Sequence, residues 1–470
     1  MTTNEHTQIW RRGAAELAAG ICTGELSARE VVDAHLDRIA AVNGALNAVT
    51  LVLAEEAGAA ADRADRAITD GNPLRPLHGV PFSVKENIDL AGSATTQGVP
   101  ALASAIPSDD APHVRRLRAA GAIPIARTNC PDFGIGWHTT STLHGATRNP
   151  WNPRVTPGGS SGGEAAAIAT GMSPLGVGGD LSGSLRWPAS CCGVAALKPT
   201  LGRIPRAAMQ EPAEQPISLQ LMLTEGPLAR RVADLRVALP VMSGQDWRDP
   251  WSVSVSEHLG AGVQRPRIAL LPDPSPGGTS PEVQRVVRDI GTAMAEAEYV
   301  VEEIEPPGIE QAATVWLDIL KSDMSLTVEE MQPPWGSEQG TFVERLFALA
   351  EPPSATRVLA AYVARARLQR AWGEFFDAGR VIVAPVYGAR PFAAQDSLTD
   401  VAGTFARMSI TTACNALGLP AVAVPGGLVD GLPIGVQVIG RRFSEEMCLD
   451  VAEVIESCAG VATPIDPRHV

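Results

Sequence analysis

Residues 157–180 read PGGSSGGEAAAIATGMSPLGVGGD, and this stretch decides the fold class. A glycine- and serine-rich loop runs into an alanine-rich helix predicted over 164–170, and a short apolar strand is predicted over 174–177. The same alternation of helix and strand recurs over 111–126 and over 283–304. Alternating elements of this kind predict an α/β fold, in which helices cover a central sheet.

The N-terminal part predicts two helices ahead of the first strand. Ser27 and Glu30 form a capping box, so a helix is expected to begin near residue 28. A second helix is expected over 53–68, and a strand over 78–85 follows. Residues 311–353 have weak periodicity and predict an irregular lid or substrate-side insertion, after which helix returns over 355–376.

Composition excludes several classes of protein. The chain has 470 residues, of which 45% are hydrophobic and 19% charged, so most of it can form a core. The net charge of −14 carries no block of like charges, which argues against nucleic-acid and anionic-membrane partners and favours a small molecule. Seven cysteines without a C-x-x-C pair predict reduced thiols. No signal peptide or membrane span is recognisable, so a cytoplasmic protein is expected.

Lysine is scarce in this sequence. Of 38 basic residues only Lys85, Lys198 and Lys321 are lysine, and arginine occupies the other positions. Arginine does not lose its proton in proteins, whereas a buried lysine can become a base. Lys85 stands at the end of the strand predicted over 78–85, where open α/β sheets place their chemistry.

The loop at 157–164 has two weak interpretations. A phosphate-binding loop needs Lys followed by Ser or Thr after the last glycine, and Glu164 stands there instead. A nucleophile elbow is matched by G-x-S-x-G at 158–162, but an α/β-hydrolase also needs a downstream histidine. Only His258 and His469 follow, the second of them at the chain end.

A third interpretation pairs this loop with the one at 179–186. A short helix and a returning strand would bring Ser184 near Ser160. The backbone N–H groups of Leu181, Ser182, Gly183 and Ser184 could then point at a developing oxyanion, as acyl transfer requires.

Several segments resemble the amidase signature family. The segment at 79–87 resembles the lysine segment of that family, and the segment at 157–166 resembles its glycine-serine segment. Similar stretches lie at 120–129, 192–200 and 418–440. The resemblance covers about residues 20–460. It implies one domain over 1–470, a large α/β domain with a central mixed β-sheet covered on both faces by helices.

The resemblance also implies a mechanism. Ser184 corresponds to the nucleophile, Ser160 to the bridging serine behind a cis Gly159–Ser160 bond, and Lys85 to the base. Amides would be cleaved through an acyl-enzyme without metal or organic cofactor, and aryl esters and carbamates are plausible substrates of the same site. Two alternatives are a subunit of a glutamine-dependent amidotransferase that works in a partnered complex and a catalytically inactive homologue that only binds.

The nucleophile loop departs from the family pattern. Asp180 and Arg186 resemble positions that brace this loop by pairing. The usual glycine pair is here Ser182-Gly183, and Leu181 replaces a more common threonine or isoleucine. These changes leave the backbone donors in place and bear on the shape of the acyl pocket.

The remaining candidates have simpler interpretations. The spacing of His138 and His144 near Cys130 matches no zinc pattern. Lys198 and Ser161 are expected to be structural. Core packing is the first interpretation of Cys191 and Cys192. It is also the first interpretation of four aromatic residues that could otherwise line an aryl pocket, Trp137, Trp187, Trp335 and Phe342.

Overall fold

The computed structural model describes residues 6–208, 215–255, 265–331 and 336–468. His258, Trp335 and His469 lie outside these residues. The strands of the described chain are β1 Val49–Val52, β2 Pro81–Lys85, β3 Ile123–Thr128, β4 Thr140–Ser141, β5 Gly145–Ala146, β6 Leu175–Asp180, β7 Ala195–Lys198, β8 Thr224–Ala229, β9 Arg267–Leu270, β10 Val301–Glu303, β11 Arg380–Pro385, β12 Ala421–Val429 and β13 Leu432–Ile439.

The described helices are α1 Ala14–Cys22, α2 Ala28–Leu46, α3 Ala54–Thr69, α4 Pro112–Ala119, α5 Gly162–Ala169, α6 Arg186–Cys192, α7 Ile217–Met222, α8 Val232–Met242, α9 Pro281–Glu296, α10 Ile309–Met331, α11 Ser337–Phe347, α12 Ala355–Asp377, α13 Val401–Arg407, α14 Ser409–Leu417 and α15 Glu445–Ala459. Short 3₁₀ helices lie at η1 His6–Arg11, η2 Pro100–Leu102, η3 Asp132–Gly134 and η4 Ala394–Asp396.

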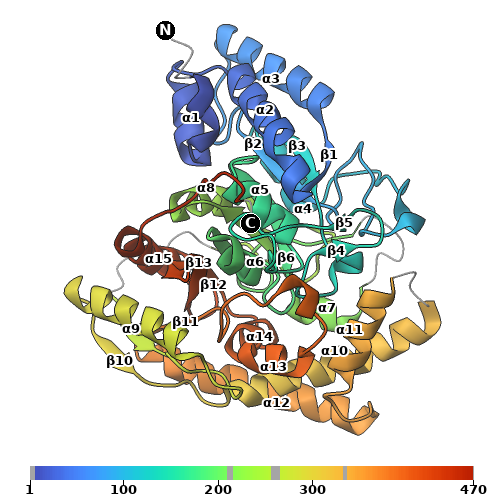
Figure 1. Ribbon diagram of the computed structural model, residues 1–470, viewed down its shortest axis with the longest axis vertical. Coiled ribbons are helices and arrows are strands. Elements are labelled where there is room, and N and C mark those ends of the chain that lie inside the picture. Colours follow the sequence, from blue (N-terminus) through green and yellow to red (C-terminus); the bar gives the residue numbers. More distant parts are fainter. Residues whose placement is uncertain (1–5, 209–214, 256–264, 332–335, 469–470) are drawn as a thin grey trace.

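A mixed sheet forms the centre of the molecule. Within the described residues it has eleven strands in the order β1-β3-β2-β6-β8-β7-β12-β13-β11-β9-β10. The β3–β2–β6 and β11–β9–β10 neighbours run parallel, and the remaining neighbours run antiparallel. The predicted fold class, one large α/β domain around a mixed sheet, is therefore confirmed (Figure 1).

Helices flank the sheet on both faces. Successive side chains of a strand point to opposite faces, so Glu225 and Gly226 of β8 face different layers. The Glu225 side chain contacts His113 of α4. Gly226 pairs with Gly178 of β6, and a Cβ on Gly178 would lie 2.7 Å from Ser161 Oγ at the start of α5. The row α4, α8, α15 and α9 thus lies on one face, and α5 and α6 lie on the other.

The helix predicted from residue 28 is confirmed, with one correction beside it. The Ser27 side chain accepts from the backbone of Glu30, and the Glu30 carboxylate accepts from the backbone of Ser27, so α2 begins with the expected capping box. The expectation of two helices before the first strand is wrong, because β1 lies between α2 and α3. This four-residue edge strand buries only Val49 fully, so it has little of the apolar pattern of a strand.

The expectation of an irregular segment over 311–353 is also wrong. Its described residues lie mainly in α10 and α11. The helix α10 packs against α12 and α14, and α11 packs against α13. Tertiary contacts of this kind stabilise helices whose own sequence has only a weak helical period.

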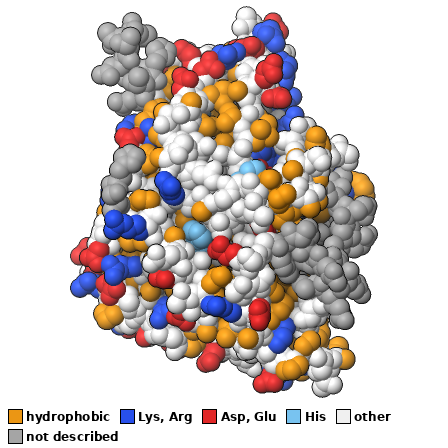
Figure 2. Space-filling view, turned by 45° about the vertical axis from the view of Figure 1, so that its right-hand side comes forward, with side chains coloured by type: hydrophobic (Ala, Val, Ile, Leu, Met, Phe, Trp, Pro, Cys, Tyr) orange, Lys and Arg blue, Asp and Glu red, His pale blue; other side chains and the backbone are white. Residues whose placement is uncertain are grey.

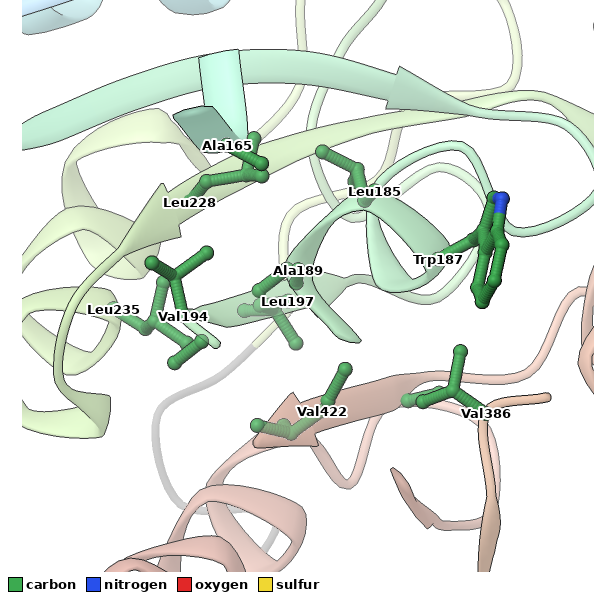
Figure 3. Close-up of a cluster of buried hydrophobic side chains, with 14 of the residues drawn as sticks. Ala165, Leu185, Trp187, Ala189, Val194, Leu197, Leu228, Leu235, Val386 and Val422 are labelled. Atoms are coloured by element: carbon green, nitrogen blue, oxygen red, sulfur yellow. The ribbon is translucent and has the colours of Figure 1, made fainter. Parts of the chain in front are cut away.

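The core next to the serine loops is densely apolar. All residues of α5 are buried, because this helix passes between the sheet and the surrounding elements. Figure 3 shows Ala165 of α5 and Leu185 near Leu228 of β8, with Leu197 of β7 and Val422 of β12 below them. The two serine loops therefore begin and end on rigidly packed elements.

The surface carries charges of both signs. Acidic and basic side chains are interspersed on the face drawn in Figure 2, and its described part shows no large basic patch. Among the described helices, none combines the length and apolar character that crossing a bilayer requires.

Candidate active site

Lys85 reaches Ser160 across the end of the sheet. It is the last residue of β2, is 1% exposed, and its Nζ donates to Ser160 Oγ at 2.7 Å. The expected contact between the scarce lysine and the first serine is therefore present.

Burial prepares Lys85 to act as a base. Desolvation lowers the pKa of its ammonium from 10.5 to about 8, while negative charge on neighbouring groups, among them Asp180 and Glu164, opposes this shift. At neutral pH a pKa near 8 leaves a substantial neutral fraction, which an exposed lysine lacks.

The backbone before Ser160 admits only glycine. The Gly159–Ser160 peptide bond is cis, as expected. A Cβ on Gly159 would lie 2.6 Å from the carbonyl oxygen of Gly136 and 2.8 Å from the carbonyl carbon of Trp137. Thr139 clamps the loop: its Oγ1 donates to the Gly158 carbonyl at 2.8 Å and accepts from the Gly162 amide at 3.0 Å.

The loop that carries Ser184 meets the Ser160 loop through the backbone. The amide of Ser161 donates to the Ser184 carbonyl at 3.3 Å. Ser184 follows β6 and is 7% exposed, so its hydroxyl lies in a nearly closed place. The structure thus brings Lys85, Ser160 and Ser184 to one end of the sheet.

Asp180 and Arg186 brace the Ser184 loop from inside the protein. Both side chains are fully buried, and Arg186 donates through Nε and a terminal nitrogen to the two carboxylate oxygens at 3.0 Å. Burial opposes ionisation of Asp180, but the charge and hydrogen bonds of Arg186 outweigh it, so the pKa of Asp180 lies below its ordinary value. The expected pairing is confirmed, and it is buried.

One predicted oxyanion donor is engaged elsewhere. The amide of Gly183 donates to Asp180 Oδ1 at 2.7 Å. An amide has a single hydrogen, so including Gly183 among the oxyanion donors is wrong for this arrangement. The amides of Leu181, Ser182 and Ser184 remain the candidates.

Glu164 is a charged neighbour of the site for which no catalytic role was expected. Its fully buried carboxylate accepts from Thr128 Oγ1 at 2.5 Å and from Ser83 Oγ, and Ser83 lies two residues before Lys85 on the same face of β2. Desolvation raises the pKa of Glu164 to about 7. A glutamate inside an otherwise apolar alanine-rich helix is the signal in the sequence that points to it.

The other lysines and the thiols have structural contacts. Lys198 Nζ donates to the Pro199 carbonyl, and Lys321 Nζ donates to the carbonyls of Phe347 and Ala350. Cys191 and Cys192 are buried, and desolvation raises the pKa of both thiols, as expected for packing residues.

The histidines near Cys130 lie beside other protein groups. His138 Nδ1 lies 3.0 Å from Thr156 Oγ1, and His144 Nε2 lies 3.7 Å from a carboxylate oxygen of Glu86. In the described part of the chain, no three His, Cys, Asp or Glu side chains gather as metal ligands would.

Aromatic rings lie against the Ser184 loop. The indole N–H of Trp137 donates to Ser182 Oγ at 3.3 Å, and that of Trp316 donates to the Leu181 carbonyl at 2.8 Å. The Trp137 ring meets Phe342 edge-on at 5.0 Å between centroids. Core packing is the first interpretation of Trp137 and Phe342 from the sequence, and both side chains are buried in the core. Trp316 was missed because nothing local links α10 to this loop.

The helix that carries Phe342 is tied to the segment that carries Trp137. The buried carboxylate of Asp132 accepts from the amide and hydroxyl of Thr142 at 2.7 and 2.6 Å and from the amide of Gly336, before α11, at 2.8 Å. Gln339 of α11 donates to the Thr140 carbonyl at 3.1 Å. Residues of the 311–353 segment therefore border the site.

Comparisons with known proteins find relatives over most of the chain. The family model described as Amidase matches residues 30–449, a range that includes both serine loops and the lysine strand. An indoleacetamide hydrolase of Bradyrhizobium diazoefficiens is 40% identical over 467 residues, which cover 96% of this chain and 87% of that protein.

Two further relatives widen the comparison. A glutamyl-tRNA(Gln) amidotransferase subunit of Synechococcus sp. (strain WH7803) is 32% identical over 482 residues, covering 95% of this chain and 97% of that protein. The solved structure of a bacterial aryl acylamidase of the amidase signature enzymes matches with a TM-score of 0.82 at 26% identity, covering 97% of this chain and 96% of the other.

Proposed function

The chain belongs to the Amidase family and is an amide hydrolase, and from this premise we propose that it cleaves the C–N bond of amides of arylacetic acids. Two observations support this substrate class. An indoleacetamide hydrolase is 40% identical to the chain, and aromatic rings lie against the loop of Ser184. Indoleacetamide is therefore the first substrate to test.

In the proposed reaction, Ser184 is the nucleophile. Neutral Lys85 takes the proton of Ser160 while Ser160 takes that of Ser184, and Ser184 Oγ attacks the amide carbonyl. The tetrahedral intermediate collapses as protonated Lys85 returns a proton through Ser160 to the departing nitrogen. Ammonia leaves from a primary amide, and water then hydrolyses the acyl-enzyme by the same proton route.

The oxyanion of the tetrahedral intermediate would be bound by backbone donors. The amides of Leu181, Ser182 and Ser184 are proposed for this role, because Asp180 takes that of Gly183. The ion pair of Asp180 and Arg186 holds the loop from behind, so the donors need not reorganise as charge develops.

The hydrogen bond of 2.7 Å between Lys85 Nζ and Ser160 Oγ carries this proposal. It joins the lysine, whose pKa burial lowers to about 8, directly to one of the two serine loops. A lysine with only a structural role could donate to any buried acceptor. Lys85 instead donates to a serine whose loop contacts the loop of Ser184.

The segment 311–353 is proposed to form the substrate-side wall. Phe342 of α11 packs on Trp137, and Asp132 ties the start of α11 to the neighbouring loop. The described part of this segment is therefore proposed as a fixed wall, whereas the sequence predicts an irregular insertion here.

The same site can accept other leaving groups. The same attack by serine gives an acyl-enzyme from an ester or an amide and a carbamoyl-enzyme or alkoxycarbonyl-enzyme from a carbamate, so aryl esters and carbamates are proposed as secondary substrates. Their hydrolysis would depend on Ser184 as amide hydrolysis does.

A second candidate function is that of an amidotransferase component. The 32% identity to a glutamyl-tRNA(Gln) amidotransferase subunit over 95% of the chain favours it. Co-purification of partner proteins together with glutaminase activity would support this function, whereas hydrolysis of indoleacetamide by the isolated chain would support the first.

Replacement of the nucleophile tests the main proposal. Purified wild-type protein is expected to release ammonia from indoleacetamide and to be labelled by a fluorophosphonate, and Ser184→Ala is expected to do neither. Ser457→Ala, on the exposed face of α15, is the matched control and should behave as wild type. Undiminished hydrolysis by Ser184→Ala would refute the proposed mechanism.

A further inference from the structure

The two positions where the nucleophile loop departs from the family pattern both contact an indole. Ser182 stands where a glycine is usual, and its Oγ accepts from Trp137 Nε1 at 3.3 Å. Leu181 precedes it, and its carbonyl accepts from Trp316 Nε1 at 2.8 Å. Two consecutive residues of the loop therefore hold two tryptophans.

These tryptophans belong to one group of four rings, here called the aromatic wall: Trp137, Trp316, Phe342 and Phe405. Trp137 stacks near Phe405 at 6.5 Å with planes 20° apart and meets Phe342 edge-on at 5.0 Å. Phe405 in turn lies 6.0 Å from Trp316. The rings come from the segment after η3, from α10, α11 and α13, so the wall surrounds one side of the loop.

The backbone of Trp137 is already fixed without Ser182. Its carbonyl accepts from the indole N–H of Trp187 at 2.9 Å and from Thr156 Oγ1 at 3.5 Å. The remaining freedom is rotation of the Trp137 side chain, and the bond to Ser182 restricts that rotation.

A glycine at position 182 would remove this restraint. Trp137 is 3% exposed, so without the serine hydroxyl its N–H would be buried with no acceptor from this position. A buried donor that loses its acceptor favours a different side-chain orientation. Ser182 therefore supplies the acceptor for the buried N–H of Trp137, and this hydrogen bond is the physical reason for a serine in place of glycine.

We propose that Ser182 is a specificity-determining residue that orients Trp137, so that the aromatic wall accepts a flat aryl-acyl group two residues from Ser184 and disfavours linear aliphatic ones. The inference rests on the proposed function, because it assumes that the acyl group binds beside this loop. Flat rings gain from stacked and edge-on contacts with aromatic walls, whereas a flexible chain gains only from burial.

The experiment compares two primary amides that release the same ammonia, phenylacetamide and hexanamide. Values of kcat and KM are measured for the wild type, Ser182→Ala, Trp137→Phe and the double variant. Trp137→Phe keeps an aromatic ring, removes the indole donor and makes the ring system smaller, so it tests the same bond from the other side together with the packing of the ring. Ser457→Ala is again the matched serine control.

Loss of the bond is expected to reduce aryl selectivity. In Ser182→Ala the ratio of kcat/KM for phenylacetamide to that for hexanamide should fall about tenfold, mainly through KM. Trp137→Phe should lower the ratio by a similar factor. The double variant should lower it no further, because both substitutions remove the same hydrogen bond. Ser182→Gly, which restores the family residue, should lower the ratio as well.

The outcomes separate this inference from the function on which it rests. If the wild type hydrolyses both amides and the ratio in Ser182→Ala and Trp137→Phe stays within about twofold of it, the inference is overturned and the amidase proposal stands. If the wild type hydrolyses neither amide, the proposed function fails and the inference with it. Should Ser182→Ala not fold, Trp137→Phe alone decides by the same ratio.

Discussion

Arg186 donates to both carboxylate oxygens of Asp180 at 3.0 Å, and neither side chain is exposed to solvent. The same carboxylate also accepts the amide of Gly183, one residue before Ser184. The position of the proposed nucleophile is therefore coupled to an ion pair that water does not reach. Arg186 also donates to Gln437 and Asn415, so this pair joins the loop to the distant C-terminal part of the chain.

Removal of the arginine should destabilise the fold. In Arg186→Met the carboxylate of Asp180 stays buried without its charged partner, and we expect a loss of about 3 to 5 kcal/mol in the free energy of unfolding. Equilibrium unfolding in urea measures this loss. The control is Arg236→Met, which removes partly exposed ion pairs with Glu446, Asp450 and Glu453 and should cost at most about 1 kcal/mol. Equal effects of the two changes would contradict the account.

Activity should rise with pH and be half-maximal near pH 8. The pKa of Lys85 is lowered to about 8, and only its neutral form can accept the Ser160 proton, so the active fraction falls as pH drops below this value. A profile of kcat/KM between pH 6 and 10 tests this expectation. Lys85→Arg should be inactive at every pH, because a guanidinium keeps its proton. An active Lys85→Arg protein would exclude lysine as the base.

Glu164→Gln should shift this profile toward lower pH. The buried carboxylate favours the charged form of Lys85, so its removal makes the neutral base available at a lower pH. Because the pKa of Glu164 is about 7, the carboxyl is mostly ionised at pH 7.5, and we expect the activity at pH 7.5, relative to that at pH 9, to rise about twofold in the variant. An unchanged profile in a folded variant would show that Glu164 does not act on the lysine.

Gly159→Ala should strongly lower activity without unfolding the protein. The new Cβ would lie 2.6 Å from the Gly136 carbonyl oxygen, so the loop must shift and carry Ser160 away from Lys85. Such a displacement should cost about 100-fold in kcat. The matched control is Gly373→Ala in α12, where nothing lies within 4 Å of the new Cβ and activity should be unchanged. Its stability should rise by up to about 1 kcal/mol.

Phe342→Ala should weaken binding of aryl substrates. The change removes the ring that meets Trp137 edge-on and opens a hole in the aromatic wall. We expect KM for indoleacetamide to rise about tenfold, while Leu349→Ala, which truncates a side chain that is 41% exposed, should change it less than about twofold. An unchanged KM in Phe342→Ala would show that α11 does not border the acyl group.

Local patterns in the sequence were sufficient for much of the architecture. The alternation of helix and strand indicated the α/β class, and Ser27 with Glu30 located the start of α2. The scarcity of lysine singled out Lys85. These features were accessible because capping, periodicity and composition act over a few residues of chain. The pairing of Lys85 with Ser160 was implied by the resemblance to the amidase signature family, and the structure shows the contact.

Only the tertiary structure decided the features that depend on contacts between distant residues. The edge strand β1 pairs with β3, and α10 and α11 are supported by neighbours, so their own sequences carried too little signal. The amide of Gly183 is occupied because a carboxylate folds back on it, and the aromatic wall joins rings between Trp137 and Phe405. Side-chain direction and burial in such contacts are set by packing across the whole domain, which no stretch of sequence contains.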